Sequence, residues 1–190
     1  MKGIRIFLAD GFEDVEALGV CDVLRRGGLK VELTAISDTP TVRSSHGVTV
    51  VPDTYLSDLE ACERGTNAND VMIFPGGMPG SKSLADSVVL MAMMRAHYAA
   101  GGTVAAICAA PGLVLSQLDG LEGVEFTCFD GFEDYLKAQG AKFRPEPAVV
   151  SGRIITGRSA GHALSFGLAI LKALKGEAVA AEVAHSLYLG

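Results

Sequence analysis

The sequence lacks the features of a membrane or secreted protein. It contains no apolar run long enough to cross a bilayer. Its opening apolar stretch, residues 1–9, is too short for a signal peptide and is soon interrupted by Asp10. We therefore expect no membrane partner and a cytoplasmic location.

Positive charge is also scarce. The chain has 16 Lys and Arg against 22 Asp and Glu, which gives a formal net charge of −6 at pH 7. The tightest basic pair, Arg25-Arg26, falls near the end of a predicted helix. A chain of this charge has no electrostatic reason to bind nucleic acid or an anionic membrane surface.

Motifs for metals, disulfides and nucleotide cofactors are missing. The four cysteines have no C-x-x-C spacing, and no pair of histidines has i,i+4 spacing with a carboxylate between them. No G-x-G-x-x-G follows the first predicted strand. We expect neither a metal site nor a cofactor, and we expect free thiols at Cys21, Cys62, Cys108 and Cys128.

Short apolar runs that alternate with helical patterns fill the chain. Its 190 residues, of which 49% are hydrophobic, suit a single domain over residues 1–190. The pattern predicts an α/β, doubly wound, mainly parallel sheet with helices on both faces. Expected strands are 4–9, 30–36, 71–74, 103–107, 126–129, 148–150 and 154–156, with a hairpin off the sheet at 41–45 and 48–51; expected helices are 13–26, 87–100, 132–138, 159–174, 177–187 and one that opens at 109.

One cysteine falls at the corner where a strand becomes a helix. The buried strand 103–107 ends at Cys108, and Pro111 is tolerated in the first turn of the helix that follows. A side chain at such a corner resembles the nucleophile elbow of α/β hydrolases. The helix N-terminus would favour the thiolate. We predict that Cys108 is a nucleophile; the alternative is a buried, inert thiol.

Groups that follow other strands could meet Cys108 at the carboxyl ends of the sheet. Glu16 is flanked by Val15 and Ala17 near the predicted core, where burial and a neighbouring thiolate would raise its pKa, so that it is protonated and donates a hydrogen bond to the sulfur. For Glu13 and Asp14 we favour the simpler role of acids in a first helical turn.

Backbone amides near the cysteine could bind an oxyanion. The pair Gly76-Gly77 has no side chains, so its N–H groups could approach a ligand together with that of Ala109. A tight turn before a helix explains the glycines equally well. Arg158 also follows a strand, where it could hold a carboxylate or pair on the surface, and His46 lies at the tip of the predicted hairpin.

Four blocks together carry a family resemblance. Residues 10–16 (DGFEDVE), 74–77 (FPGG), 106–111 (AICAAP) and 156–161 (TGRSAG) resemble, in order and spacing, the ThiJ/PfpI superfamily, and most of all its subgroup of the parkinsonism-associated deglycase and bacterial relatives. The resemblance implies a flavodoxin-like sandwich related to class I glutamine amidotransferases, usually a homodimer, and covers nearly the whole chain.

The resemblance also implies roles for single residues. Cys108 matches the elbow cysteine, Glu16 its protonated partner, and Gly76, Gly77 and Ala109 the amide pocket. His46 matches a position that reaches the other subunit's site in family dimers. Arg158 matches an arginine with a structural role.

Two departures narrow the expected activity. The family's proteases have histidine directly after the nucleophile, where this chain has Ala109, so we do not expect a peptidase. Deglycase and glyoxalase relatives have a histidine where this chain is expected to place Cys128, and a thiol does not replace imidazole as a base at neutral pH. Glu16 would then transfer protons alone, or the glyoxalase reaction would be weak in this chain. Alternatively, Cys128 would act as a resolving thiol for Cys108.

Two functions follow as hypotheses. The first is a cysteine-dependent enzyme of the glyoxalase or deglycase type that acts on reactive dicarbonyls or glycated adducts, with Cys108 as nucleophile and Glu16 as proton shuttle. The second is an oxidative-stress sensor or chaperone without turnover, which works through oxidation of Cys108.

Overall fold

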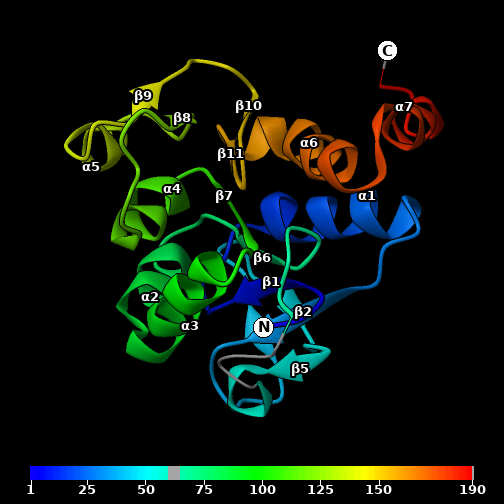
Figure 1. Ribbon diagram of the computed structural model, residues 1–190. Coiled ribbons are helices and arrows are strands. Elements are labelled where there is room, and N and C mark those ends of the chain that lie inside the picture. The colour runs from blue at the N-terminus through cyan, green and yellow to red at the C-terminus, as the bar shows by residue number, and fades with distance from the viewer. Residues whose placement is uncertain (60–64, 190) are drawn as a thin grey trace.

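The computed structural model describes residues 1–59 and 65–189, so Cys62 lies outside the described residues. Its centre is a seven-stranded sheet in the order β10-β11-β7-β6-β1-β2-β5 (Figure 1). All neighbours in this sheet run parallel except the pair β10 and β11. The strands are β1 (Ile4–Leu8), β2 (Val31–Ala35), β5 (Thr54–Tyr55), β6 (Val71–Phe74), β7 (Thr103–Ile107), β10 (Ala148–Ser151) and β11 (Ile154–Gly157).

Successive side chains of the central strands pack alternately in two separate hydrophobic cores, one on each face of the sheet. In β1, Ile4, Ile6 and Leu8 pack in one core and Phe7 packs in the other. The other central strands, β6 and β7, alternate in the same way. Because successive side chains of a strand point to opposite faces, a strand that is apolar throughout must be covered on both sides. This is the predicted α/β architecture, and it is confirmed.

Helices cover each face of the sheet (Figure 1). The first core receives α1 (Val20–Arg26), α6 (Ala163–Lys175) and α7 (Glu177–Ser186). The second receives α2 (Gly80–Asp86), α3 (Val88–Ala99) and α4 (Ala110–Leu113). The helices α1 and α6 pack closely because Gly167 of α6 has no side chain and leaves room for Val23 of α1. A Cβ added at Gly167 would lie only 3.1 Å from the Val23 Cβ.

Two small sheets lie outside the main one. The hairpin of β3 (Val42–Arg43) and β4 (Thr49–Val50) forms off the main sheet, as predicted. The strands β8 (Glu125–Phe126) and β9 (Lys142–Phe143) pair in parallel around α5 (Asp134–Lys137). Short turns of 3-10 helix occur at η2 (Leu56–Asp58), η3 (Leu115–Gln117) and η4 (Ala160–His162).

The predicted strands 71–74 and 103–107 are confirmed residue for residue, and the other strands agree within a few residues. Three predictions were incomplete. The helix expected from 13 begins with a π-helical turn, η1 (Val15–Gly19), before α1. The helix expected from 109 is only four residues long. The helix α2 and the strands β5 and β9 were not predicted, because they are short and carry little periodicity.

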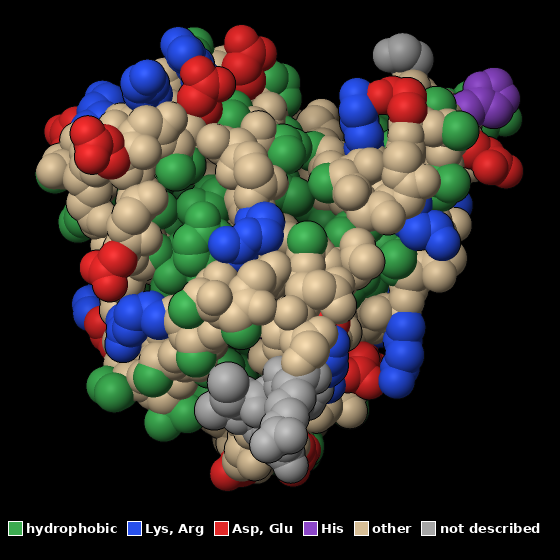
Figure 2. Space-filling view, viewed as in Figure 1, with side chains coloured by type: hydrophobic (Ala, Val, Ile, Leu, Met, Phe, Trp, Pro, Cys, Tyr) green, Lys and Arg blue, Asp and Glu red, His purple; other side chains and the backbone are tan. Residues whose placement is uncertain are grey.

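Charged side chains of both signs are spread over the surface. In the face seen in Figure 2, Lys and Arg side chains alternate with Asp and Glu around the outline, and hydrophobic side chains show between them. Among the described residues, no helix is both long and apolar enough to span a bilayer.

Candidate active site

Cys108 directly follows β7, and its backbone bends sharply. Its φ angle is 66°, in the left-handed region that non-glycine residues seldom adopt. Two hydrogen bonds hold this conformation: the Cys108 N–H donates to the Gly157 carbonyl at 3.1 Å, and its carbonyl accepts the N–H of Phe129 at 2.8 Å. Helix α4 begins two residues later. The predicted elbow is therefore present, and the strain is of the kind that concentrates at functional sites.

Glu16 lies beside the cysteine, on the π-helical turn η1. Its side chain is fully buried. Carboxylate Oε2 accepts the N–H of Gly76 at 2.8 Å, and Oε1 has no hydrogen-bond partner among the described residues. Single π-helical turns occur mostly at functional sites. An unpartnered buried carboxylate oxygen is costly unless it carries a proton.

Gly76 packs against both of these side chains. A Cβ added to Gly76 would lie 2.6 Å from the Cys108 Cβ, 2.6 Å from Glu16 Oε2 and 3.0 Å from the Cys108 Sγ. Any other residue would collide with the cysteine and the glutamate. The absence of a side chain at Gly76 is therefore what lets the carboxyl group and the thiol lie next to each other.

Burial raises the pKa of both groups. Burial, with a smaller effect of the Glu13 charge, raises the pKa of Glu16 to about 7, although hydrogen bonds from Cys108 and Gly76 act the other way. Burial and then the Glu16 charge raise the pKa of Cys108 to about 12, against the N–H groups of Ala109 and Gly77. The expected helix-terminus effect is thus outweighed, because α4 is short and the thiol is buried beside a carboxylate.

Such a pair titrates as a unit. Because the pKa of Glu16 is near 7 and that of Cys108 near 12, the carboxyl group loses its proton before the thiol does. The proton that remains is held mainly by the thiol, and its transfer to Glu16 would leave a thiolate.

The three amides proposed for an oxyanion divide into two roles. The N–H groups of Gly77 and Ala109 face the Cys108 sulfur. The N–H of Gly76 is already engaged by Glu16. Gly76 is therefore not a free donor, which corrects the expectation of a three-amide pocket. The amides of Gly77 and Ala109 remain for an anion near the sulfur.

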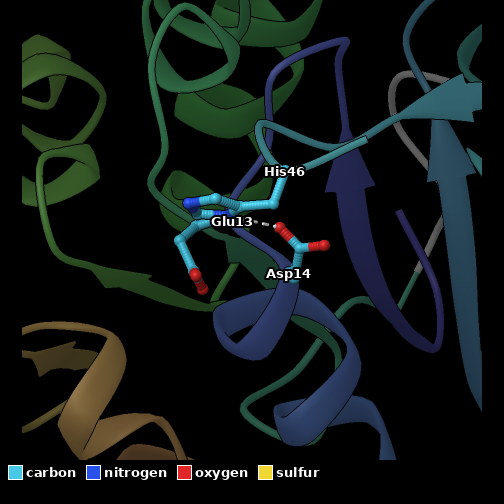
Figure 3. Close-up of side chains that lie close together, drawn as sticks. All are labelled: Glu13, Asp14 and His46. Carbon is cyan, nitrogen blue, oxygen red and sulfur yellow. Dashed lines mark hydrogen bonds and ion pairs between the residues drawn. The ribbon is translucent and has the colours of Figure 1, made fainter. Parts of the chain in front are cut away.

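His46 lies at the tip of the β3–β4 hairpin and contacts the turn that carries Glu16. Its Nδ1 is 2.9 Å from Asp14 Oδ2, and the Ser44 hydroxyl donates to Asp14 Oδ1 at 2.7 Å. Figure 3 shows Glu13 beside this pair but not bonded to it. The Glu13 carboxylate instead accepts the Glu16 N–H at 2.8 Å. Glu13 therefore caps the helical turn as predicted, whereas Asp14 fastens the hairpin.

These three side chains are also of metal-ligating type. Ligand atoms of Glu13, Asp14 and His46 lie within 4.8 Å of one another. The sequence did not predict this group, because its members are far apart in the chain. Hydrogen bonds within the protein already account for the arrangement.

Two other candidates make contacts of their own. Arg158 donates to Asp130 Oδ1 at 2.6 Å and its guanidinium lies over the Phe143 ring, while its Nη1 is buried without a hydrogen-bond partner among the described residues. Cys128 is fully buried and packs in the second core, whereas Cys108 packs against the first. Burial raises the pKa of Cys128 to about 12. This placement speaks against the predicted alternative of a resolving thiol.

The structure adds residues that the sequence analysis did not consider. Phe129, rather than Cys128, is half-exposed, and its backbone binds Cys108. Met78 follows Gly77 and is also half-exposed. In the pair Cys128-Phe129, one side chain is buried and the next is exposed. A shift of the segment by one residue would exchange these two environments, and an irregular segment gives no sequence pattern from which its register could be predicted.

Comparisons with known proteins agree on one family. The model of the DJ-1/PfpI family matches residues 2–173. Protein DJ-1alpha of Drosophila melanogaster is 37% identical over 98% of this chain and 83% of its own length. The glutathione-independent glyoxalase DJR-1.2 of Caenorhabditis elegans is 35% identical over 86% of this chain and 83% of its own length. Among solved structures, oxidized DJ-1 of Toxoplasma gondii has a TM-score of 0.86 and 30% identity over 99% of this chain and 98% of that one.

Some relatives are longer than the matched segment. The chain spans about half the length of the two Arabidopsis thaliana DJ-1 homologues, 47% of homolog A and 42% of homolog B.

Proposed function

Because this chain belongs to the DJ-1/PfpI family, we propose that it is a cysteine-dependent enzyme that acts on reactive dicarbonyls or on their glycated adducts. The observation that carries the proposal is the buried pair of Cys108 and Glu16, with the amides of Gly77 and Ala109 at the sulfur. The C. elegans relative, a glyoxalase, supports the same reaction class.

The reaction begins at the sulfur. In the form of the pair with the proton on Glu16, the Cys108 thiolate attacks the aldehyde carbon and forms a C–S bond. The carbonyl electrons move to oxygen, the amides of Gly77 and Ala109 stabilise that charge, and Glu16 donates its proton to give a hemithioacetal.

Glu16 then moves a second proton. As a carboxylate it takes the hydrogen of the carbon bound to sulfur and returns it to the neighbouring carbon, which converts the hemithioacetal into a thioester. Water cleaves the thioester and releases the hydroxy acid and the free thiol, so methylglyoxal plus water gives lactate. From a glycated adduct, the amine or thiol would leave and the original side chain would be restored.

The test is lactate formation from methylglyoxal in an amine-free buffer. Cys108→Ser should abolish turnover, and Glu16→Gln should lower kcat by about 10²-fold or more. Cys21→Ala is the matched control, since Cys21 is a free thiol in the first core. Lactate formation at the wild-type rate by Cys108→Ser would overturn the proposal.

A second candidate, an oxidation sensor or chaperone, is favoured by the same two amides. A sulfinate on Cys108 would accept hydrogen bonds from Gly77 and Ala109 and from a protonated Glu16. Mild peroxide should then add two oxygens to Cys108 before it modifies Cys21. Equal oxidation of both thiols, read by peptide mass spectrometry, would exclude this role.

We also propose that the chain is a cytoplasmic homodimer. Val15 beside Glu16 is 48% exposed, and Val48 and Val51 on the nearby hairpin are exposed as well. Val15 also lines a groove with Tyr188 and Leu189. Exposed apolar side chains gathered in this way are typical of an interface. Sedimentation equilibrium should give twice the 19.7 kDa mass of the chain, and Val15→Glu should give monomers.

A further inference from the structure

Two large apolar side chains on segments that contact Cys108 are exposed instead of being buried in a core. Met78 is 53% exposed and Phe129 is 47% exposed. Each belongs to a segment whose backbone contacts Cys108. We call this pair the apolar mouth.

Met78 is held at the site by its neighbours in the chain. It directly follows Gly77, whose N–H faces the Cys108 sulfur. The Ser81 hydroxyl donates to the Met78 Sδ at 3.5 Å and to the Gly77 carbonyl at 2.7 Å. These bonds keep the thioether just before α2, one residue after the amide that faces the sulfur.

Phe129 reaches the site from the opposite segment. Its N–H donates to the carbonyl of Cys108 at 2.8 Å, which fixes its backbone one hydrogen bond away from the nucleophile. The preceding side chain, Cys128, is fully buried in the second core, whereas the Phe129 ring remains half-exposed. The ring is therefore available to a ligand at Cys108.

The charges around the mouth do not suit an anion. The basic side chains of the flanking segments are already paired, Arg158 with Asp130 at 2.6 Å and His46 with Asp14 at 2.9 Å. The Glu13 carboxylate lies close enough to Glu16 to act on it electrostatically. An anionic carbonyl compound would meet this negative charge, and both of these basic side chains already hold an acidic partner.

We propose that the apolar mouth selects carbonyl substrates with a neutral aromatic or other bulky apolar substituent, such as aryl 2-oxoaldehydes, over small or anionic ones. An aromatic ring in the substrate would stack on Phe129 and contact the polarizable sulfur of Met78. This inference rests on the proposed function for its chemistry, but the binding preference itself can be measured without turnover.

The first experiment compares three alkylating probes that share one reacting group. Iodoacetamide, 2-iodo-N-phenylacetamide and iodoacetate each form an S–C bond to the Cys108 thiolate and release iodide. They differ in being small and neutral, aromatic and neutral, or anionic. Rates at Cys108 are read by peptide mass spectrometry and divided by the rate of each probe with glutathione, which removes intrinsic reactivity.

The proposal predicts a normalised rate about tenfold higher for the phenyl probe than for iodoacetamide, and a lower one for iodoacetate. The double variant Met78→Ala, Phe129→Ala should bring the phenyl preference close to one, and Glu13→Gln should raise the iodoacetate rate. Val150→Ala is the matched control, since Val150 is 49% exposed on the edge strand β10. No phenyl preference in the wild type, or a preference that survives the double variant, would overturn the inference.

A turnover experiment separates this inference from the proposed function. Phenylglyoxal should have a higher kcat/KM than methylglyoxal, and Phe129→Ala should lower that ratio mainly through KM, because it removes binding that the substrate and transition state share. If both dicarbonyls are turned over with the same kcat/KM, the inference about the apolar mouth is overturned and the proposed function stands. A phenyl-probe preference without any dicarbonyl turnover overturns the proposed function and leaves the apolar mouth standing as a binding surface.

Discussion

The carboxylate of Glu16 accepts the N–H of Gly76 at 2.8 Å, although the two residues are 60 positions apart in the chain. One comes from the π-helical turn after β1 and the other from the turn after the neighbouring strand β6. The contact anchors the carboxyl group at the carboxyl edge of the sheet, where the third strand, β7, presents Cys108. Three adjacent strands thus deliver the three parts of the site.

Gly76→Ala should disable the site. The new Cβ would lie 2.6 Å from both the Cys108 Cβ and Glu16 Oε2, so the glutamate and the cysteine must move apart. We expect a loss of about 1–3 kcal/mol in the free energy of unfolding and loss of Cys108 reactivity at neutral pH. Urea unfolding and iodoacetamide labelling measure the two effects.

Gly161→Ala is the control for that change. A Cβ at Gly161 meets no heavy atom within 4 Å, so this variant should keep the stability and reactivity of the wild type. If Gly76→Ala labels at the wild-type rate, the close packing of glycine, glutamate and cysteine does not control the thiol.

Glu16→Gln should stabilise the fold at alkaline pH. The pKa of Glu16 is raised from 4.5 to about 7, so the folded state binds its proton more tightly than the unfolded state. Stability from this group is present at pH values below about 4.5 and is lost as pH rises to about 7, by about 3 kcal/mol in total. Glutamine imitates the protonated form and avoids that loss. Urea unfolding at pH 5 and pH 8 should show the variant gaining on the wild type only at pH 8; an equal difference at both values would contradict a raised pKa.

His97 should make the fold sensitive to acid. It is buried, with Nε2 3.1 Å from the Asp70 carbonyl and 3.0 Å from that of Thr103, which requires Nε2 to be the donor. Burial lowers its pKa below the usual 6.5. The folded state therefore resists protonation, and stability from this group is lost as pH falls below about 6.5.

His97→Gln should remove the loss of stability at acid pH, but it also removes the ring N–H that donates to the two backbone carbonyls. The variant should be less stable than the wild type at pH 8 by about 1–3 kcal/mol, and the difference should shrink toward pH 5. Thermal or urea unfolding across this range gives the answer. A difference that grows as pH falls would mean that His97 is charged in the folded state.

Much of the fold could be predicted because apolar runs mark buried strands directly. Residues 71–74, and 104–107 after Thr103, are apolar throughout and are buried on both faces. The position of Cys108 followed from the end of such a strand. The short elements α2, β5 and β9 were beyond prediction, since pieces of two to seven residues are fixed by tertiary contacts rather than by local pattern.

Details of the site depended on three-dimensional contacts. The sequence placed Glu16 near Cys108 but could not show that Gly76 gives its N–H to the carboxylate rather than to a ligand. Nor could it show that His97, in the middle of a predicted helix, is buried. The pKa of Cys108 was expected to be low because a helix follows, yet burial and Glu16 raise it to about 12. The balance between a short helix terminus and burial is set only by packing.

The most direct test of the account is the pH dependence of Cys108 alkylation by iodoacetamide, read by peptide mass spectrometry in the wild type and in Glu16→Gln. If the pair shares one proton above pH of about 7, the wild-type rate should show a first rise with a midpoint near 7, below the ~8.5 of a free thiol, and a second rise at much higher pH, where the last proton leaves. In Glu16→Gln no carboxyl can take the proton, so the first rise should be absent and burial should keep the single midpoint above ~8.5. No rise near pH 7 in the wild type, or the same rise in both proteins, would contradict the claim that Glu16 activates Cys108.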